Sequence, residues 1–147
     1  MEIAVLGLGC FWGPEIKFSK VSGVIKTEVG YCGGNTKETT YEEVCTGKTN
    51  HAEVVKLDFD PKIISYEKIL EYFFEIHDPT TLNSQGPDFG TQYRSEIFYL
   101  NDKQKKIANE VLDKENIKLS KKVVTKISLL KNYCVAEEHH QKYLEKR

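Results

Sequence analysis

The stretch Gly7-Leu8-Gly9-Cys10-Phe11-Trp12-Gly13-Pro14-Glu15 joins an apolar segment to one with helical character. The residues before it, 2–6, are apolar and compatible with a strand that is buried on both faces, which predicts a central strand. After it, Pro14 and Glu15 are typical of the first turn of a helix, and residues 16–18 continue the helical pattern. The stretch therefore predicts a central strand that leads directly into a helix.

Cys10 lies at this junction, with its sulfur near the positive end of the helix dipole. This position favours the thiolate, which is the reactive form of cysteine, and Phe11 and Trp12 would form an apolar wall beside it. We therefore predict that Cys10 is a nucleophile. A buried structural cysteine is the alternative. A dinucleotide-binding loop is disfavoured, because Trp12 occupies the position of the third glycine of that motif.

The composition is that of an ordinary soluble domain: 147 residues, 39% hydrophobic and 29% charged, with a net charge of −1. Residues 1–147 are expected to form a single domain. The charge balance gives no reason to expect a nucleic-acid partner, and no apolar run approaches the length of a membrane span. Cysteines at 10, 32, 45 and 134 have the spacing of neither a disulfide framework nor a zinc site. We expect no metal and a reducing cytoplasmic location.

Glu53 is the second residue whose position in the sequence indicates a chemical role. In the strand predicted over residues 52–59, the alternation of side chains places Glu53 on the same face as Val55, Leu57 and Phe59. A carboxyl group on an apolar face is costly unless it is protonated or partnered. Desolvation would raise its pKa and make it a proton donor near neutral pH. The alternative is a side chain at a frayed strand end that reaches solvent.

The rest of the chain alternates strands and helices. A capping box at Thr40 and Glu43 starts a short helix with Tyr41 in its first turn, where Tyr41 taken alone is an ordinary packing residue. Residues 78–94 lack periodicity and are longer than most connections, so this loop is expected to be functional, with Asp88, Tyr93 and Arg94 as its polar groups. Further strands are predicted at 24–31, 95–100 and, as an edge strand, 120–130; further helices are predicted at 65–77, 102–115 and 135–144. This order favours a two-layer α/β sandwich with a mixed sheet.

Several blocks of the sequence, in order, resemble the A-type peptide methionine sulfoxide reductases. The first is the Cys10 block, Gly9-Cys10-Phe11-Trp12-Gly13. It is followed by Gly30-Tyr31-Cys32-Gly33-Gly34, by the segment from Thr40 to Thr49, by His51-Ala52-Glu53, by Gly90-Thr91-Gln92-Tyr93-Arg94-Ser95 and by the segment from Ala136 to Gln141. The blocks cover nearly the whole chain. The resemblance implies an α+β fold of ferredoxin-like type, with a mixed sheet and helices packed on one face.

The resemblance also implies a reaction and roles for site residues. The family returns the S-epimer of methionine sulfoxide, free or in proteins, to methionine. By resemblance, Cys10 attacks the sulfoxide sulfur and becomes a sulfenic acid, and Glu53 donates a proton to the oxygen. Tyr41 and Tyr93 would donate hydrogen bonds to that oxygen. Asp88 would support the site, while Phe11 and Trp12 would hold the S-methyl group.

Regeneration of Cys10 is where the sequence departs from many relatives, which carry a resolving cysteine in a glycine-rich tail. Cys134 is a candidate resolving cysteine, although it could equally be a packing residue. Otherwise an external thiol would regenerate Cys10 directly: thioredoxin, glutaredoxin with glutathione, or dithiothreitol in vitro. We expect no bound cofactor and a monomer. Two smaller departures are Asn50 in place of glycine and Thr40 in place of proline.

Two function classes remain as alternatives to an enzyme. One is a module that binds oxidised methionine, or becomes oxidised itself, without turnover; intact Cys10, Glu53, Tyr41 and Tyr93 argue against it. The other is a zinc-bound structural protein, which the Cys and His spacings support poorly. His77 is expected to be a capping or core histidine, and the neighbours His139 and His140 would make a poor metal pair on a helix.

Overall fold

The computed structural model describes residues 1–119 and 122–146. Within these residues, six strands form one sheet in the order β7-β6-β1-β3-β2-β8. The strands are β1 (Glu2–Leu8), β2 (Val24–Cys32), β3 (Ala52–Phe59), β6 (Ser95–Tyr99), β7 (Lys126–Leu129) and β8 (Cys134–Val135). β1 lies between β3 and β6, so the prediction of a central strand is confirmed.

The four inner strands have the ferredoxin-like arrangement. β6, β1, β3 and β2 are neighbours in that order, and each pairs antiparallel with the next. β7 adds to β6 in parallel, which makes the sheet mixed. The predicted two-layer, ferredoxin-like fold with a mixed sheet is therefore confirmed. β7 is an edge strand as predicted, although it is shorter than residues 120–130, of which 120 and 121 lie outside the described residues.

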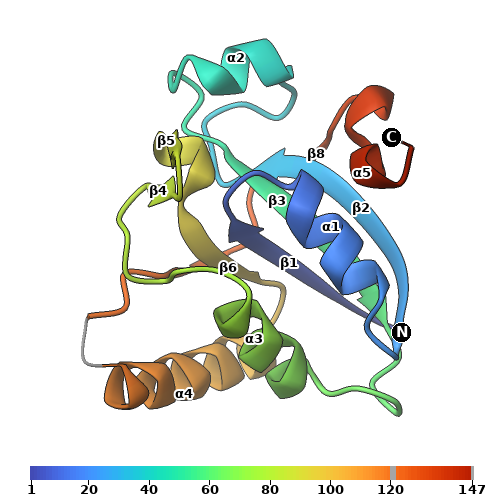
Figure 1. The fold of residues 1–147 in the computed structure, drawn as a ribbon, viewed down its shortest axis with the longest axis vertical. Helices are drawn as coiled ribbons and strands as arrows, with labels where there is room; N and C mark the ends of the chain where they lie inside the picture. The colour runs from blue at the N-terminus through green and yellow to red at the C-terminus, as the bar shows by residue number, and fades with distance from the viewer. Residues whose placement is uncertain (120–121, 147) are drawn as a thin grey trace.

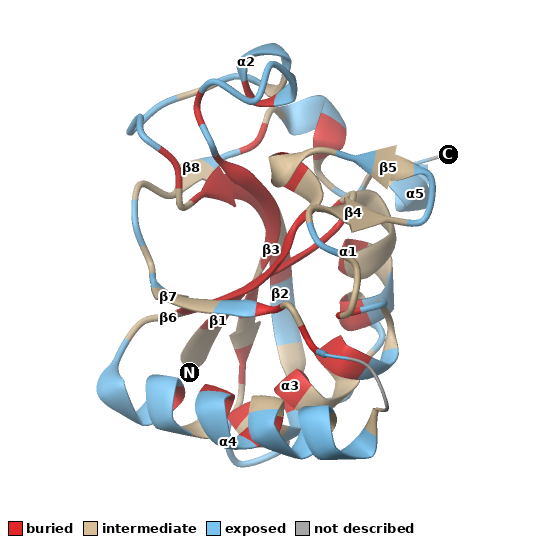
Figure 2. Cartoon of the chain, turned by 90° about the vertical axis from the view of Figure 1, so that its left-hand side faces the viewer, coloured by how far each residue is buried: buried red, intermediate tan, exposed pale blue. Residues whose placement is uncertain are grey.

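One face of the sheet is covered by α1 (Trp12–Ser19), α3 (Tyr66–Glu75) and α4 (Asp102–Lys118) (Figure 1). The main apolar core lies between these helices and the strands, where Leu6 and Leu57 meet Phe18 of α1, Ile69 of α3 and Ala108 of α4. The period-2 pattern of β1 and β3 directs these side chains to one face, and removal of their apolar surface from water stabilises the fold. Figure 2 shows that the strands are largely buried, while α4 exposes its outer side.

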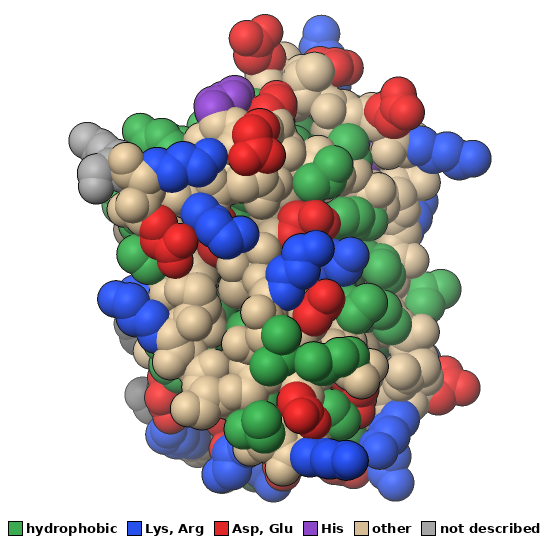
Figure 3. All heavy atoms as spheres, turned by 90° about the vertical axis from the view of Figure 1, so that its right-hand side faces the viewer, with side chains coloured by type: hydrophobic (Ala, Val, Ile, Leu, Met, Phe, Trp, Pro, Cys, Tyr) green, Lys and Arg blue, Asp and Glu red, His purple; other side chains and the backbone are tan. Residues whose placement is uncertain are grey.

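The opposite face of the sheet has a smaller apolar cluster. Val5, Val54 and Phe98 are fully buried there, and Leu130 and Tyr133 from the segment between β7 and β8 pack against them. On the side of the molecule that carries α1 and β2, acidic and basic side chains are interspersed among apolar ones (Figure 3). Among the described residues, no helix has both the length and the apolar character needed to cross a bilayer.

Three short elements gather at the end of the sheet where β1 leads into α1 (Figure 1). They are α2 (Tyr41–Cys45), the hairpin of β4 (Ser84–Gln85) with β5 (Asp88–Phe89), and the 3-10 helix η1 (Thr91–Tyr93). The capping box of α2 is confirmed, because Thr40 Oγ1 accepts a hydrogen bond from the Glu43 backbone N–H at 3.2 Å. The segment predicted as a long functional loop thus contains a small ordered hairpin.

The helix predicted over residues 135–144 is wrong. The segment instead forms β8, a 3-10 turn η2 (Glu138–His140) and a short α5 (Tyr143–Lys146). β8 pairs with β2, and the Ala136 N–H donates to Val29 O, which uses an amide that a helix would have used internally. Lys142 adopts a left-handed backbone conformation with φ of 50°, which interrupts any helix at that point.

Candidate active site

Cys10 lies in the turn between β1 and α1, as predicted. Gly9 before it has φ of 100°, and a Cβ at that position would come within 2.9 Å of the Gln85 side chain. The turn therefore depends on glycine for both conformation and space. It leaves the Cys10 side chain half-buried as a free thiol at the start of α1.

The expectation that the position of Cys10 favours the thiolate is wrong. Burial raises the pKa of the thiol to about 11, against a lowering contribution from the Trp12 backbone hydrogen bond, and the carboxylates of Glu53 and Asp88 raise it further. Burial and these acidic neighbours outweigh the helix terminus. In the free protein the raised pKa therefore favours the neutral thiol over the thiolate.

Glu53 lies close to Cys10 in a position that favours the neutral acid. Its side chain is buried, with a relative exposure of 1%. The Phe11 backbone N–H donates to Oε1 and the Gln92 amide donates to Oε2, each at 3.3 Å. Burial raises the pKa of Glu53 to about 7, with Asp88 adding to the increase and the two hydrogen bonds opposing it. The prediction of an inward-facing carboxyl is confirmed.

Three further predicted site residues lie near Glu53: Tyr41, Tyr93 and Asp88. The pKa of Tyr41 is raised by burial, by its hydrogen bond with Cys45 and by the proximity of Glu53 and Tyr93. Burial and Glu53 likewise raise the pKa of Tyr93. Both phenols therefore remain protonated and can donate hydrogen bonds. Asp88 is near enough to raise the pKa values of Cys10, Glu53 and Tyr93.

An aromatic cluster contains the two residues that follow Cys10 in the chain, Phe11 and Trp12. Phe11 is 2% exposed and packs against Tyr31, with ring centroids 5.7 Å apart. The Trp12 ring stacks on Tyr143 at 3.9 Å, and its Nε1 donates to His140 Nδ1 at 3.1 Å. These contacts fix Phe11 and Trp12 in place, and their role as an apolar wall beside the Cys10 sulfur stays a prediction.

The C-terminal segment contributes Glu137, which holds Tyr41 through hydrogen bonds. One carboxylate oxygen of Glu137 accepts from the Tyr31 hydroxyl at 2.8 Å, and the other accepts from the Tyr41 backbone N–H at 2.9 Å. Although burial favours the neutral acid, these hydrogen bonds lower the pKa of Glu137. Glu137 therefore anchors the start of α2, and with it Tyr41, to β2.

Comparison with known proteins identifies the family. The family model described as peptide methionine sulfoxide reductase matches residues 2–147. The peptide methionine sulfoxide reductase MsrA of Pelagibacter ubique is 82% identical over 147 residues, covering 100% of both chains. The MsrA of Saccharolobus solfataricus is 52% identical over 146 residues, covering 99% of this chain and 82% of that one.

The chain belongs to the peptide methionine sulfoxide reductase family. It is an oxidoreductase that reduces methionine sulfoxide. Reduced Mxr1 of Saccharomyces cerevisiae is one of its structural neighbours, with a TM-score of 0.95 and 40% identity, over 99% of this chain and 85% of that one. The structure of Mxr1 in complex with Trx2 matches with a TM-score of 0.69 and 27% identity, over 97% of this chain and 84% of that one.

The other cysteines of this reductase lie in three different environments. Cys32 is fully buried on the face opposite the site, beside Val5 and Phe98. Cys45 is exposed in α2, and its Sγ accepts from the Gln92 amide at 3.3 Å. Cys134 is half-buried and pairs across β8 and β2 with Tyr31, which in turn pairs with Glu53. Because directly paired residues share a face of a sheet, Cys134 lies on the face of the site.

Three residues of the site were missed by sequence reasoning: Gln92, Glu137 and His140. Gln92 lies in a loop without periodicity. Its place in the family block from Gly90 to Ser95 and the need of a buried Glu53 for a partner were the signals that could have found it. Glu137 and His140 were hidden by the wrong helix prediction. His77 has a structural role as predicted, since its Nε2 lies 2.7 Å from Ser95 Oγ and its Nδ1 contacts the Phe73 carbonyl. No group of three His, Cys, Asp or Glu side chains in the described residues could hold a metal ion.

Proposed function

We propose that this reductase acts on the S-epimer of methionine sulfoxide, free or in proteins, with Cys10 as the nucleophile and Glu53 as the proton donor. The observation that carries the proposal is a buried carboxyl beside the thiol, with its pKa raised to about 7. A carboxyl with this pKa is substantially protonated at neutral pH and can act as a general acid. Such repair of oxidised methionine restores an apolar side chain to a damaged protein.

The reaction begins at the sulfoxide oxygen. Glu53 donates its proton to that oxygen, which makes the sulfur electrophilic, and the Cys10 sulfur forms a bond to it. The positive charge that develops on the substrate sulfur stabilises the neighbouring thiolate, so that substrate binding offsets the raised pKa of Cys10. The sulfur–oxygen bond of the substrate then breaks as the oxygen passes to the Cys10 sulfur, where it becomes the hydroxyl of a sulfenic acid. The transient sulfur–sulfur bond breaks as methionine leaves, and the thiol proton restores Glu53. One sulfoxide is reduced as one thiol is oxidised.

Tyr41, Tyr93 and Asp88 assist this step. The two phenols donate hydrogen bonds to the oxygen as its charge changes, the role of oxyanion-hole donors. The charge of Asp88 favours the protonated form of Glu53. On the apolar side, Phe11 and Trp12 hold the S-methyl group, where a charged group would not fit.

An external thiol then regenerates Cys10. A thioredoxin-type reductant is supported by the complex of the structural neighbour Mxr1 with Trx2, and a glutaredoxin or glutathione system is the other candidate. Cys134 is the proposed resolving cysteine because it lies on the site face of the sheet. Its thiol would displace water from the Cys10 sulfenic acid to form a disulfide, which the external dithiol then reduces.

A mass measurement tests the role of Cys134. Protein treated with one equivalent of sulfoxide and no reductant, with free thiols then blocked, is expected to lose two hydrogens in the wild type by disulfide formation. In Cys134→Ser it is expected to gain one oxygen at Cys10. If both proteins gain one oxygen, Cys134 is a packing residue and the external thiol attacks Cys10 directly.

The choice of epimer is tested with a methionine sulfoxide peptide of defined configuration. With dithiothreitol as reductant, the purified protein is expected to convert the S-epimer and to leave the R-epimer unchanged. Equal conversion of both epimers, or conversion of neither, would contradict the proposal. Tight binding of the S-epimer without methionine release would instead indicate a binding module.

We further propose that residues 1–147 act as a single domain and a monomer.

A further inference from the structure

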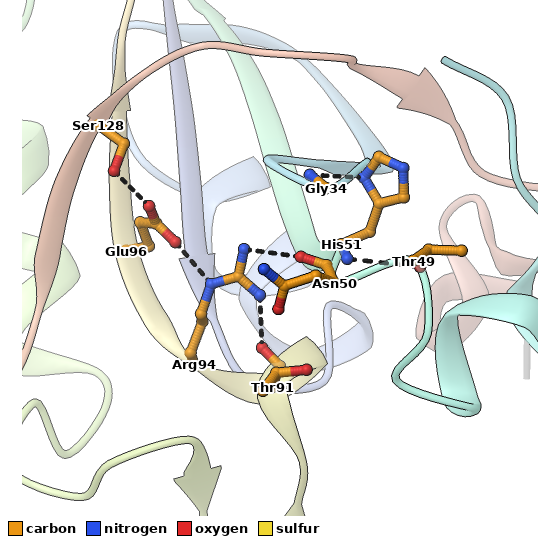
Figure 4. Close-up of polar contacts among 8 residues, drawn as sticks. All are labelled: Gly34, Thr49, Asn50, His51, Thr91, Arg94, Glu96 and Ser128. Atoms are coloured by element: carbon orange, nitrogen blue, oxygen red, sulfur yellow. Dashed lines mark hydrogen bonds and ion pairs between the residues drawn. The ribbon is translucent and has the colours of Figure 1, made fainter. Parts of the chain in front are cut away.

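We propose that Arg94 is a positioning residue of this reaction, which holds the segment carrying Gln92 against the segment carrying Glu53. This inference rests on the proposed role of Glu53. Arg94 lies between η1 and β6 and is 7% exposed. Figure 4 shows its guanidinium between the two segments, at the centre of a polar network that reaches from β7 to the loop before β3.

The guanidinium binds one backbone carbonyl from each segment. Nη2 donates to Asn50 O at 3.0 Å, and Nη1 donates to Thr91 O at 2.8 Å. Asn50 is three residues before Glu53, and Thr91 is one residue before Gln92. A single rigid, planar group therefore sets the separation of the acid and its hydrogen-bond donor.

Both segments adopt a positive φ at or next to the residue that Arg94 binds. Asn50 has φ of 57° and lies two residues before the start of β3, while Gly90, with φ of 136°, directly precedes Thr91 at the start of η1. The left-handed conformation of Asn50 is uncommon for a residue other than glycine, and contacts such as the one with Arg94 help to hold it. The Gln92–Glu53 hydrogen bond is 3.3 Å long, so a small displacement of either segment would break it.

The remaining side of the guanidinium pairs with Glu96 of β6. Arg94 Nε lies 2.6 Å from Glu96 Oε1, and the second Glu96 oxygen accepts from Ser128 Oγ at 2.6 Å. Glu96 is also buried, so the ion pair fixes the guanidinium in one orientation. Lysine could keep the charge beside Glu96 but not donate to both carbonyls in this geometry.

The test uses the titration of Glu53, followed by NMR of its labelled carboxyl carbon and assigned by comparison with Glu53→Gln. The ionisable groups that face Glu53 are Cys10, Asp88, Tyr31, Tyr41 and Tyr93, and all are unchanged in the variants. Because the Gln92 hydrogen bond lowers the pKa of Glu53, Gln92→Met is expected to raise it by about one unit. Arg94→Lys is expected to raise the pKa of Glu53 as well.

The decisive comparison is the double variant. If Arg94 acts through Gln92, Arg94→Lys adds no further shift in the Gln92→Met background. Arg94→Lys is also expected to lower kcat for sulfoxide reduction about 10- to 100-fold, with a smaller change in KM. An unshifted Glu53 in Arg94→Lys, or shifts that add in full in the double variant, would overturn the proposal.

Two further variants separate positioning from stability. Gln104 is a matched control, because it is buried and also ties two backbone groups, Ile3 O and Leu100 N, at the far end of β1. Gln104→Leu is expected to lower Tm and to leave the Glu53 titration and kcat unchanged; a shift there as large as in Arg94→Lys would overturn the proposal. If Arg94→Lys fails to fold, the double variant Arg94→Met and Glu96→Met takes its place in these measurements. It removes both members of the buried ion pair and so leaves no unpaired charge. The titration needs no turnover, so an inactive wild type would contradict the proposed function alone.

Discussion

Cys10→Ser is expected to lose at least about 10⁴-fold of the rate of sulfoxide reduction, which leaves no measurable turnover. The reaction requires an atom that bonds to the sulfoxide sulfur and then accepts its oxygen, and a serine hydroxyl cannot be oxidised in this way. The surroundings of residue 10 are expected to remain intact, because serine fits the half-buried thiol position. The measurement is methionine release from an S-sulfoxide peptide with dithiothreitol in excess.

The matched control is Cys32→Ala, which removes a thiol from the opposite face of the sheet. Cys32 is fully buried among apolar side chains, so this change is expected to lower stability slightly and to leave kcat near the wild-type value. Retention of more than about one per cent of the activity in Cys10→Ser, well above the level expected for loss of a nucleophile, would mean that another group attacks the sulfoxide.

Glu53→Gln is expected to lower kcat about 10²- to 10⁴-fold, the range typical of a lost general acid. Glutamine keeps the shape and can still bind the Phe11 N–H, but it has no proton to donate at neutral pH. The pH dependence should change as well. In the wild type the protonated acid is the active form, and its raised pKa of about 7 means that activity falls as the pH rises through 7. In Glu53→Gln this alkaline limb should be absent.

The control for this second change is Glu15→Gln. Glu15 is also buried, and its carboxylate accepts hydrogen bonds from Thr27 Oγ1 and from the Lys142 N–H. Its replacement is expected to leave the alkaline limb in place. An alkaline limb that persists unchanged in Glu53→Gln would assign it to another group and contradict the role of Glu53.

The sequence was most informative where a single periodic pattern decides the structure. Alternation along residues 52–59 placed Glu53 on the buried face, because the side chains of a strand alternate strictly. The junction at Cys10 was predictable because a buried strand and a helical first turn are separated by glycines. The departure at Asn50, where the family has glycine, also has a local explanation, since asparagine tolerates the left-handed conformation found there.

The structure was needed where distant segments act together. The pKa of Cys10 depends on burial and on Glu53 and Asp88, which lie far away in the chain, whereas the local pattern contained only the helix terminus. The C-terminal segment is similar, because its pairing with β2 overrides the local helical pattern. For Arg94 the sequence indicates only a polar group in a functional loop, and for Gln92 only a place in a family block, since their partners are Glu53 and two backbone carbonyls.

The most direct test of the central claim is a single turnover without reductant. One equivalent of an S-sulfoxide peptide is mixed with the protein, a sulfenic acid trap is added, and the tryptic peptide from Met1 to Lys17 is weighed. We predict one methionine per chain and either a trapped sulfenic acid or a disulfide at Cys10. Methionine formation with Cys10 unchanged, or with modification only at another cysteine, would contradict the account.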